Sequence, residues 1–122
     1  DMFLIKDNHI EVAGSITKAV EACVKYNKKH HTKFKIEVET KNLKEVEEAI
    51  KTKADIIMLD NFEVDEMKKA VVLINGKCKV EASGGVTIDT VKAIAETGVD
   101  FISVGALTHS VKALDISLEI TL

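Results

Sequence analysis

The residues with the clearest chemical potential lie in the segment from Glu81 to Val86, EASGGV. This segment ends a predicted strand with a small residue and two glycines, and Thr87 then begins a helical pattern. Backbone N–H groups that are left free before a helix amino terminus can hold an anion, most often a phosphate. The alternative is a tight turn that needs glycine only for its backbone dihedral angles.

Three charged residues end other predicted strands. Lys6 is a cation that can pair with a phosphate or a carboxylate, and the alternative is a structural ion pair. Glu39 and Asp60 carry hard oxygen ligands, which can accept hydrogen bonds from ribose hydroxyls or hold Mg²⁺ directly or through water. The alternative for this pair is that it only neutralises Lys6.

A histidine follows the last glycine element of the chain. Gly105 ends a predicted strand, and His109 just beyond it can donate to a phosphate or cap a helix. His30 and His31 lie in a lysine-rich connector, where we expect them to be solvated. The spacing of serine, histidine and carboxylate residues supports no nucleophilic triad.

A repeated strand–helix pattern must position these residues. Apolar runs predict buried strands at 3–6, 34–39, 54–59, 78–83 and 101–104, and alternation predicts a half-exposed strand at 114–122. Apolar residues at helical spacing predict helices that begin at Ser15, Asn42, Val64 and Thr87 and end near Tyr26, Ile50, Ile74 and Gly98. Residues 7–9 are predicted to be a polar loop, and residues 27–33 a basic connector.

Two architectures fit this α/β pattern: an open doubly wound sheet, or a closed or partial β/α barrel. Side-chain alternation favours the barrel. The apolar residues around Glu37 share the strand face that helices must cover, and the glutamates share the other face. Lys79 and Glu81 alternate in the same way, so the polar faces point into a barrel interior. There we expect Glu37, Glu81 and Lys79 to form ion pairs with one another.

In such a barrel the functional groups lie at the carboxyl ends of the strands. Each predicted strand brings a polar, charged or glycine element to this rim. The two glycine elements come from the last two parallel strands, where such barrels often bind phosphate. This position favours phosphate binding over a simple turn for the EASGGV segment.

The composition excludes several classes of protein. The chain has 122 residues, which is room for one small domain. A net charge of −3 gives no basic footprint for nucleic acid, and no apolar run is long enough to cross a membrane. Cys23 and Cys78 belong to no metal or redox motif and are expected to be reduced, which predicts a cytoplasmic protein.

The chain resembles the carboxyl-terminal half of the nicotinate-nucleotide pyrophosphorylase (carboxylating) family, also called the quinolinate phosphoribosyltransferase family. The blocks that carry the resemblance are MFLIKDNH at 2–9, EVE at 37–39, IMLDN at 57–61, EASGG at 81–85, SVGALTH at 103–109 and ALDIS at 113–117. They occur in the family's order and span nearly the whole chain. Together they are highly specific, although no single block is.

The resemblance implies an enzyme that joins quinolinate to 5-phosphoribosyl 1-pyrophosphate and releases pyrophosphate and carbon dioxide. The product, nicotinate mononucleotide, serves de novo NAD synthesis, and the reaction uses Mg²⁺. The family fold implies an amino-terminal α/β domain and an incomplete, TIM-like α/β barrel. It also implies a homodimer, in some cases a hexamer of dimers, in which the partner subunit completes each active site.

By motif, the resemblance also implies a role for each residue of the rim. The candidate catalytic residues are Lys6, which contacts quinolinate, and Glu39 and Asp60, which face the ribose hydroxyls and the metal-bound substrate. The substrate-binding residues of the phosphate pocket are Ser83, Gly84, Gly85, Gly105, Ala106 and His109.

Two motifs of the family, arginine-lysine-threonine and histidine-arginine, are absent and would lie before Asp1. We therefore expect residues 1–113 to be part of the barrel and residues 114–122 to form a strand that joins a missing amino-terminal α/β domain. The absence of proline and the opening directly on a strand also favour a piece of a longer protein. The isolated chain is expected to be inactive, because Lys6 alone cannot hold both carboxylates of quinolinate.

Two other functions stay open. One is a related phosphoribosyltransferase that uses the same rim with a different acceptor base, because the residues that select the base are not among those matched. The other is a non-catalytic remnant that binds a phosphate ligand. Acceptor panels test the first, and ligand binding without product formation would identify the second.

Overall fold

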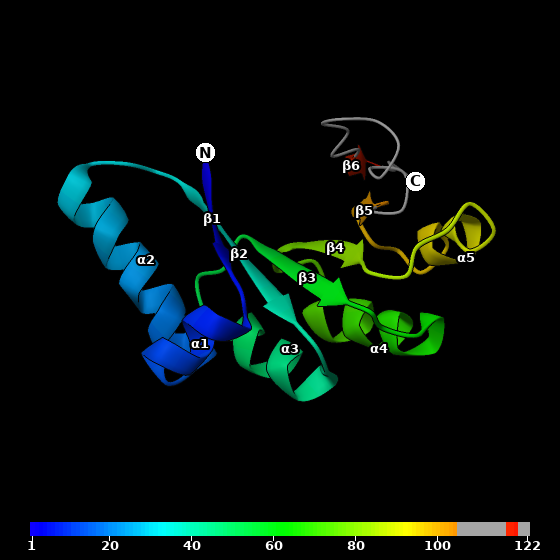
Figure 1. Ribbon diagram of the computed structural model, residues 1–122, viewed down its shortest axis with the longest axis horizontal. Coiled ribbons are helices and arrows are strands. Elements are labelled where there is room, and N and C mark those ends of the chain that lie inside the picture. The colour runs from blue at the N-terminus through cyan, green and yellow to red at the C-terminus, as the bar shows by residue number, and fades with distance from the viewer. Residues whose placement is uncertain (105–116, 120–122) are drawn as a thin grey trace.

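In a computed structural model of this chain, residues 1–104 and the backbone of residues 117–119 are described. Their strands form one sheet in the order β1-β2-β3-β4-β5-β6 (Figure 1). The strands are β1 (Met2–Ile5), β2 (Lys35–Thr40), β3 (Ile56–Asp60), β4 (Lys79–Ser83), β5 (Phe101–Ser103) and β6 (Ser117–Glu119). The first five are parallel, and β6 is antiparallel to β5.

Helices connect the parallel strands and lie along one side of the sheet (Figure 1). They are α1 (Asp7–Ala13), α2 (Ile16–His30), α3 (Leu43–Ile50), α4 (Val64–Ile74) and α5 (Val91–Ala95). Because neighbouring strands are also consecutive in the chain, crossovers of one hand place every helix on the same face. This is a partial β/α barrel, and it excludes the doubly wound sheet, which carries helices on both faces. Within the described residues, every helix is too short or too polar to cross a membrane.

The hydrophobic core lies between the sheet and the helices. Ile57 and Leu59 of β3 are fully buried at its centre. The helices contribute the inward stripes that the sequence predicts: Ile16, Ala19 and Val20 from α2, Val46 and Ala49 from α3, Met67, Ala70 and Ile74 from α4, and Ile94 from α5. Burial of these apolar side chains is the main favourable contribution to the fold.

The opposite face of the sheet carries polar residues, as the alternation predicts. The strand register places Glu39 beside Met58 and Met58 beside Glu81. One level nearer the carboxyl ends, Asp60 lies beside Ser83. The sheet therefore directs its candidate functional side chains to the face that the helices leave uncovered.

The polar loop predicted at residues 7–9 is wrong, because these residues begin α1. Lys6 is the N-cap of this helix, and its backbone N–H donates to Nδ1 of His9 at 3.0 Å. Gly14 ends the helix in the left-handed conformation. Ile10 and Ala13 pack against the core, which gives this short helix its tertiary support.

α2 continues to His30, beyond the end predicted near Tyr26. The ring of Tyr26 lies 4.1 Å from that of His30 one turn later. The side chain of Asn27 donates to the carbonyl of Phe34 at 2.9 Å and accepts from its N–H at 3.2 Å, which ties the end of the helix to the start of β2. The first part of the basic connector, residues 27–30, is helical because lysine has a good helix propensity, and His31 ends the helix in the left-handed conformation.

Two aspartates, each just before a strand, bind the start of the preceding strand in the sheet in the same way: Asp55 links β3 to β2, and Asp100 links β5 to β4. Asp55 Oδ2 accepts from the N–H of Ile36 at 2.8 Å, and the N–H of Asp55 donates back to the carbonyl of Ile36 at 2.8 Å. Asp100 forms the same reciprocal pair with Val80, with both distances 2.8 Å. Each aspartate thereby satisfies a backbone group that the amino end of its sheet would otherwise leave unpaired.

Replacing Asp100 with alanine should lower the free energy of unfolding by about 1–3 kcal/mol, because the N–H of buried Val80 loses its acceptor. Urea denaturation followed by circular dichroism measures this loss. Asp89→Ala, at an exposed position, is the matched control and should change stability by less than about 0.5 kcal/mol. Equal effects of the two substitutions would contradict this role of Asp100.

The strand predicted at residues 114–122 is described only at residues 117–119, where it pairs with β5. The structure contains this chain alone. The boundary at residue 113 and the pairing of the last strand with another domain therefore stay predictions.

Candidate functional site

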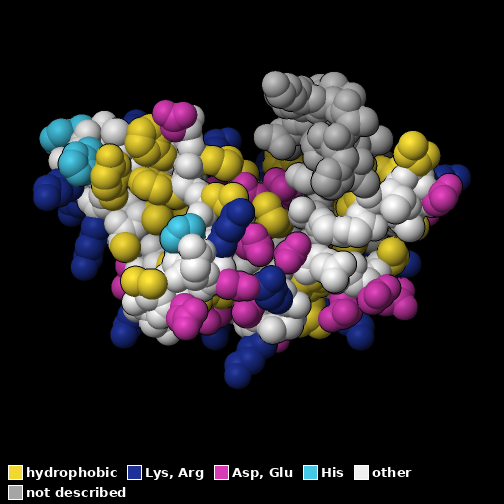
Figure 2. Space-filling model, viewed as in Figure 1, with side chains coloured by type: hydrophobic (Ala, Val, Ile, Leu, Met, Phe, Trp, Pro, Cys, Tyr) yellow, Lys and Arg dark blue, Asp and Glu magenta, His cyan; other side chains and the backbone are white. Residues whose placement is uncertain are grey.

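The carboxyl ends of β1, β2 and β3 bring three carboxylates to one lysine. Nζ of Lys41 lies 3.2 Å from Asp7 Oδ2, 3.2 Å from Asp60 Oδ2 and 3.7 Å from Glu39 Oε1. Figure 2 shows acidic side chains gathered with lysine near the middle of this view, over the ends of these strands. The structure thus brings Glu39 and Asp60 together as predicted, and it adds Asp7 and Lys41.

Lys41, rather than Lys6, is the cation that neutralises the predicted carboxylate pair. Lys6 is exposed, and among residues 1–104 its side chain forms no ion pair. Lys41 is not among the residues predicted from the sequence. The available signal is that Lys41 follows Glu39 by two residues at the end of an extended segment, where alternate residues share a face.

The turn after β4 packs directly against Asp60 and Asn61. Gly84 and Gly85 both have positive φ, 81° and 65°. A Cβ on Gly84 would lie 2.9 Å from Asp60 Oδ1 and 3.0 Å from the backbone nitrogen of Asn61. That nitrogen donates to the carbonyl of Ser83 at 2.8 Å. Gly84 is therefore required by close packing as well as by its dihedral angles.

The helix after this turn begins later than predicted, at Val91 instead of Thr87. Thr87 and Thr90 bind each other, with the N–H of Thr87 donating to Thr90 Oγ1 at 3.0 Å and the N–H of Thr90 donating to Thr87 Oγ1 at 3.3 Å. Thr87 thus makes the capping contacts that the sequence predicts for it, but the regular helix begins only at Val91, so its dipole does not begin directly at the glycine turn. An anion at this turn would rely on backbone N–H groups and side chains.

One of the remaining residues of the predicted phosphate pocket, Ser83, lies within the described residues. Ser83 is half-buried at the end of β4, beside Asp60 on β3. Gly105, Ala106 and His109 lie outside the described residues. Their part in the pocket stays a prediction.

The interior face of the sheet holds a pair of carboxyl groups instead of the predicted ion pairs with Lys79. Glu37 and Glu81 are only 5% and 8% exposed, and their side chains are hydrogen-bonded to each other. Oγ of Ser103 donates to Glu81 Oε2 at 2.6 Å. Lys79 lies at the start of β4, and its long side chain reaches outward to Asp100 at 3.9 Å.

Burial raises the pKa of Glu37 from 4.5 to about 8, and the hydrogen bond to Glu81 and the charges of Glu81 and Glu39 act in the same direction. Protonated Glu37 can donate the hydrogen bond that the carboxylate of Glu81 accepts. The Oε1 atom of Glu37 is buried without a hydrogen-bond partner among the described residues. Ser103 binds Glu81 alone, so the contact between the two carboxyl groups relies on the proton that Glu37 retains.

The stability of the chain should depend on the protonation of Glu37. Between pH 4.5 and about 8 the folded chain retains a proton that the unfolded chain releases. The contribution of this group is complete below the lower pH and is lost as the pH rises through the upper one. The stability of wild type relative to Glu37→Gln should therefore fall across this window, by up to about 1.4 kcal/mol per pH unit. Urea denaturation at several pH values measures it, and parallel profiles would refute it.

The described residues contain no cluster of three or more histidine, cysteine or acidic residues arranged to hold a metal ion. Cys23 and Cys78 are free and half-buried, and burial raises the pKa of both thiols, so neither offers a ready thiolate. The oxygens of Glu39 and Asp60 are of the hard type that Mg²⁺ prefers. Lys41 already lies within ion-pair distance of both.

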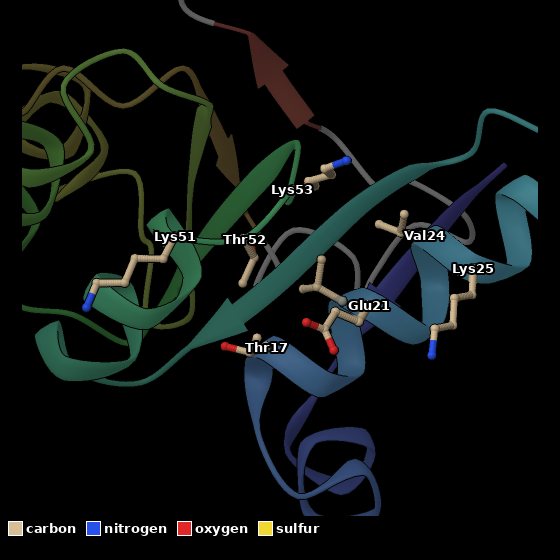
Figure 3. Close-up of a pocket in the computed structure, with 8 residues that line it drawn as sticks. Thr17, Glu21, Val24, Lys25, Lys51, Thr52 and Lys53 are labelled. Atoms are coloured by element: carbon tan, nitrogen blue, oxygen red, sulfur yellow. The ribbon is translucent and has the colours of Figure 1, made fainter.

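Two cavities within the described residues lie away from this rim. One, of about 340 Å³, lies between α2 and the end of α3 and has Val20 and Val24 in its lining (Figure 3). Figure 3 shows the ammonium groups of Lys25 and Lys51 directed away from each other, so they form no anion site. The other, of about 610 Å³, lies at the amino ends of β2 to β5. The candidate site is instead the open rim at the carboxyl ends.

Comparison with known proteins gives the same family at three levels. The family "Quinolinate phosphoribosyl transferase, C-terminal domain" matches residues 1–119. A chloroplastic nicotinate-nucleotide pyrophosphorylase (carboxylating) from Oryza sativa subsp. japonica is 51% identical over 98% of this chain and 36% of the rice protein. The corresponding protein of Arabidopsis thaliana is 49% identical over 98% of this chain and 39% of its own length.

A solved structure of the nicotinate-nucleotide pyrophosphorylase from Francisella tularensis aligns with a TM-score of 0.83 and 47% identity. The alignment covers 99% of this chain and 42% of the Francisella chain, so this chain spans less than half of the relatives it matches. Lys6, Glu39, Asp60 and the glycine turn all lie within the family match. The chain therefore belongs to the quinolinate phosphoribosyltransferase family, in which it corresponds to the carboxyl-terminal domain.

Proposed function

We propose that this chain is the phosphoribosyl-binding part of an enzyme that makes nicotinate mononucleotide from quinolinate and 5-phosphoribosyl 1-pyrophosphate. The reaction releases pyrophosphate and carbon dioxide. The observation that carries the proposal is the pair of carboxylates, Glu39 and Asp60, beside the Gly84 turn in a chain of this family. Two relatives from Nicotiana tabacum are named quinolinate phosphoribosyltransferase (decarboxylating), which agrees with the proposed substrate and with the loss of carbon dioxide.

The reaction needs acceptors at the ribose. As pyrophosphate leaves the anomeric carbon, positive charge develops on the ring, and preorganised carboxylates stabilise such charge. We assign to Glu39 and Asp60 the hydrogen bonds from the ribose hydroxyls and part of this stabilisation. Mg²⁺, when bound, neutralises charge on the leaving pyrophosphate. The quaternised pyridine ring is its own electron sink for the loss of carbon dioxide.

The other rim residues suit the two anionic substrates. Lys6 is exposed and, within residues 1–104, unpaired, so its ammonium is available to a carboxylate of quinolinate. Ser83, Gly84 and Gly85 form the open turn that we assign to the ribose phosphate. The assignment extends to Gly105, Ala106 and His109 through the family resemblance. The further carboxylate contacts of quinolinate would come from another part of the protein, so we propose that the isolated chain is inactive.

The proposal includes the metal, the assembly and the location. We place Mg²⁺ at Glu39 and Asp60, directly or through water, together with the pyrophosphate group of the substrate. We propose a homodimer or a hexamer of dimers, which size-exclusion chromatography with light scattering tests. The relatives from rice and Arabidopsis are chloroplastic by name. For this chain we propose the cytoplasm, where its free thiols stay reduced.

The test is an assay of the longest polypeptide that contains this chain, with quinolinate, 5-phosphoribosyl 1-pyrophosphate and Mg²⁺. Mass spectrometry should identify nicotinate mononucleotide. Glu39→Ala should lower turnover by at least about tenfold without changing the circular dichroism spectrum. Product from a different base would indicate a related phosphoribosyltransferase, and substrate binding without product would indicate a non-catalytic protein. Unchanged turnover in both Glu39→Ala and Asp60→Ala would refute the assigned roles.

A further inference from the structure

Lys41 joins residues that come from three separate strand ends. Asp7 follows β1, Glu39 lies in β2 and Asp60 ends β3, and all three carboxylates are within 3.7 Å of the Lys41 ammonium. Asp7 is largely exposed, but the side chains of Glu39 and Asp60 are only 15% and 28% exposed. The two carboxylates assigned to the ribose are therefore the more sheltered members of the cluster.

The charges of this cluster need Lys41. Three carboxylates around one ammonium repel one another, and without it their side chains would move apart. Hydrogen bonds to Asp7 and Asp60, followed by the charges of the same two residues, raise the pKa of Lys41 above its usual value. The ammonium is therefore charged at neutral pH.

Asp60 connects this cluster to the glycine turn. Its Oδ2 atom is hydrogen-bonded to Lys41 at 3.2 Å. Its Oδ1 atom lies so close to the backbone of Gly84 that a Cβ there would approach to 2.9 Å. One oxygen is thus held by the ammonium while the other packs against the turn, so the position of Lys41 bears on both parts of the rim.

We propose that Lys41 is a positioning residue for the phosphoribosyl donor. It holds Glu39 and Asp60 in the geometry that accepts the ribose, and it offsets the repulsion between these carboxylates and the anionic donor. The inference rests on the proposed function, because it concerns the same site. Lys41 acts through Asp60 and Glu39, so its effect should be specific to the donor and should depend on Asp60.

The test compares Lys41→Met and Lys41→Arg in the longest polypeptide that contains this chain. Lys44→Met is the matched control, because Lys44 is an exposed lysine of α3 that forms no ion pair among the described residues. Lys41→Met should raise the KM for 5-phosphoribosyl 1-pyrophosphate by about tenfold and leave the KM for quinolinate within about twofold. Lys41→Arg should recover most of the loss, and Lys44→Met should behave as wild type.

A double substitution distinguishes an effect of Lys41 that passes through Asp60 from a general effect on the structure. In a protein that already carries Asp60→Asn, Lys41→Met should raise the KM for 5-phosphoribosyl 1-pyrophosphate by less than about twofold. The reason is that the contact through which Lys41 acts is already weakened. An equal rise in this KM in wild type and in the Asp60→Asn protein would show that Lys41 does not act through Asp60. A donor KM for Lys41→Met within about twofold of wild type would overturn the proposal altogether.

Isothermal titration calorimetry with 5-phosphoribosyl 1-pyrophosphate and Mg²⁺ separates this inference from the proposed function. Binding to wild type that Lys41→Met weakens about tenfold supports the inference even if no nicotinate mononucleotide forms. Binding that Lys41→Met leaves unchanged overturns the inference alone. No binding to wild type overturns both.

Discussion

Asp60→Ala is expected to lower the turnover for nicotinate mononucleotide by about 100-fold or more, which is the size of effect found when a preorganised electrostatic contact at a reacting centre is lost. Asp60 contacts both Lys41 and the glycine turn. Its removal takes away the proposed ribose acceptor and leaves Lys41 to the remaining carboxylates, Asp7 and Glu39. Steady-state kinetics with both substrates measures the change.

The control for this substitution is Asp65→Ala. Asp65 lies in the first turn of α4 and is exposed, so its loss should leave turnover within about twofold of wild type. Circular dichroism should show that both variants are folded. Turnover of Asp60→Ala equal to that of Asp65→Ala would show that the ribose does not bind at the end of β3.

Gly84→Ala is expected to have the largest effect on stability, a loss of about 2–4 kcal/mol. Two costs combine at this position. The backbone has φ 81°, which L-residues rarely adopt, and the new Cβ would lie 2.9 Å from Asp60 Oδ1 and 3.0 Å from the backbone nitrogen of Asn61. The backbone of Asn61 cannot move aside as the end of a flexible side chain would. Urea denaturation measures the loss.

Gly76→Ala is the matched control for Gly84→Ala, because it introduces the backbone strain of a positive φ without a steric clash. Gly76 has φ 75°, and a Cβ there would meet no atom within 4 Å. This substitution should cost only about 1–2 kcal/mol, from backbone strain. The difference between the two glycines therefore isolates the packing of the turn against Asp60 and Asn61. Equal losses would mean that the turn has room for a side chain.

The sequence was sufficient for the layout of the sheet because burial leaves a strong periodic pattern. The inward stripe of α4, with Met67, Ala70 and Ile74, could be read from its spacing, and the helix has the predicted bounds. Alternation in the strands separated the covered face from the polar face. Glu39 and Asp60 could be found because they end two of the strands so identified.

Other features depend on where long side chains reach, which periodicity does not specify. Lys79 shares a strand face with Glu81, but it starts the strand and extends outward to Asp100. Glu37 and Glu81 therefore share a proton-mediated contact that charge counting would not predict. Lys41 and Asp7 meet only because β1, β2 and β3 end side by side. The short helix α1 is missed for a similar reason, since its support comes from contacts with the core.

Hydrogen–deuterium exchange with mass spectrometry tests the central claim, that the carboxyl-end rim binds the phosphoribosyl donor, most directly. The longest polypeptide that contains this chain is compared with and without 5-phosphoribosyl 1-pyrophosphate and Mg²⁺. We predict that the donor slows exchange in peptides covering residues 39–42, 60–62 and 83–86, and leaves residues 76–79 at the opposite ends of the strands unchanged. Protection confined to residues 76–79, or binding with no protection at the rim, would contradict it.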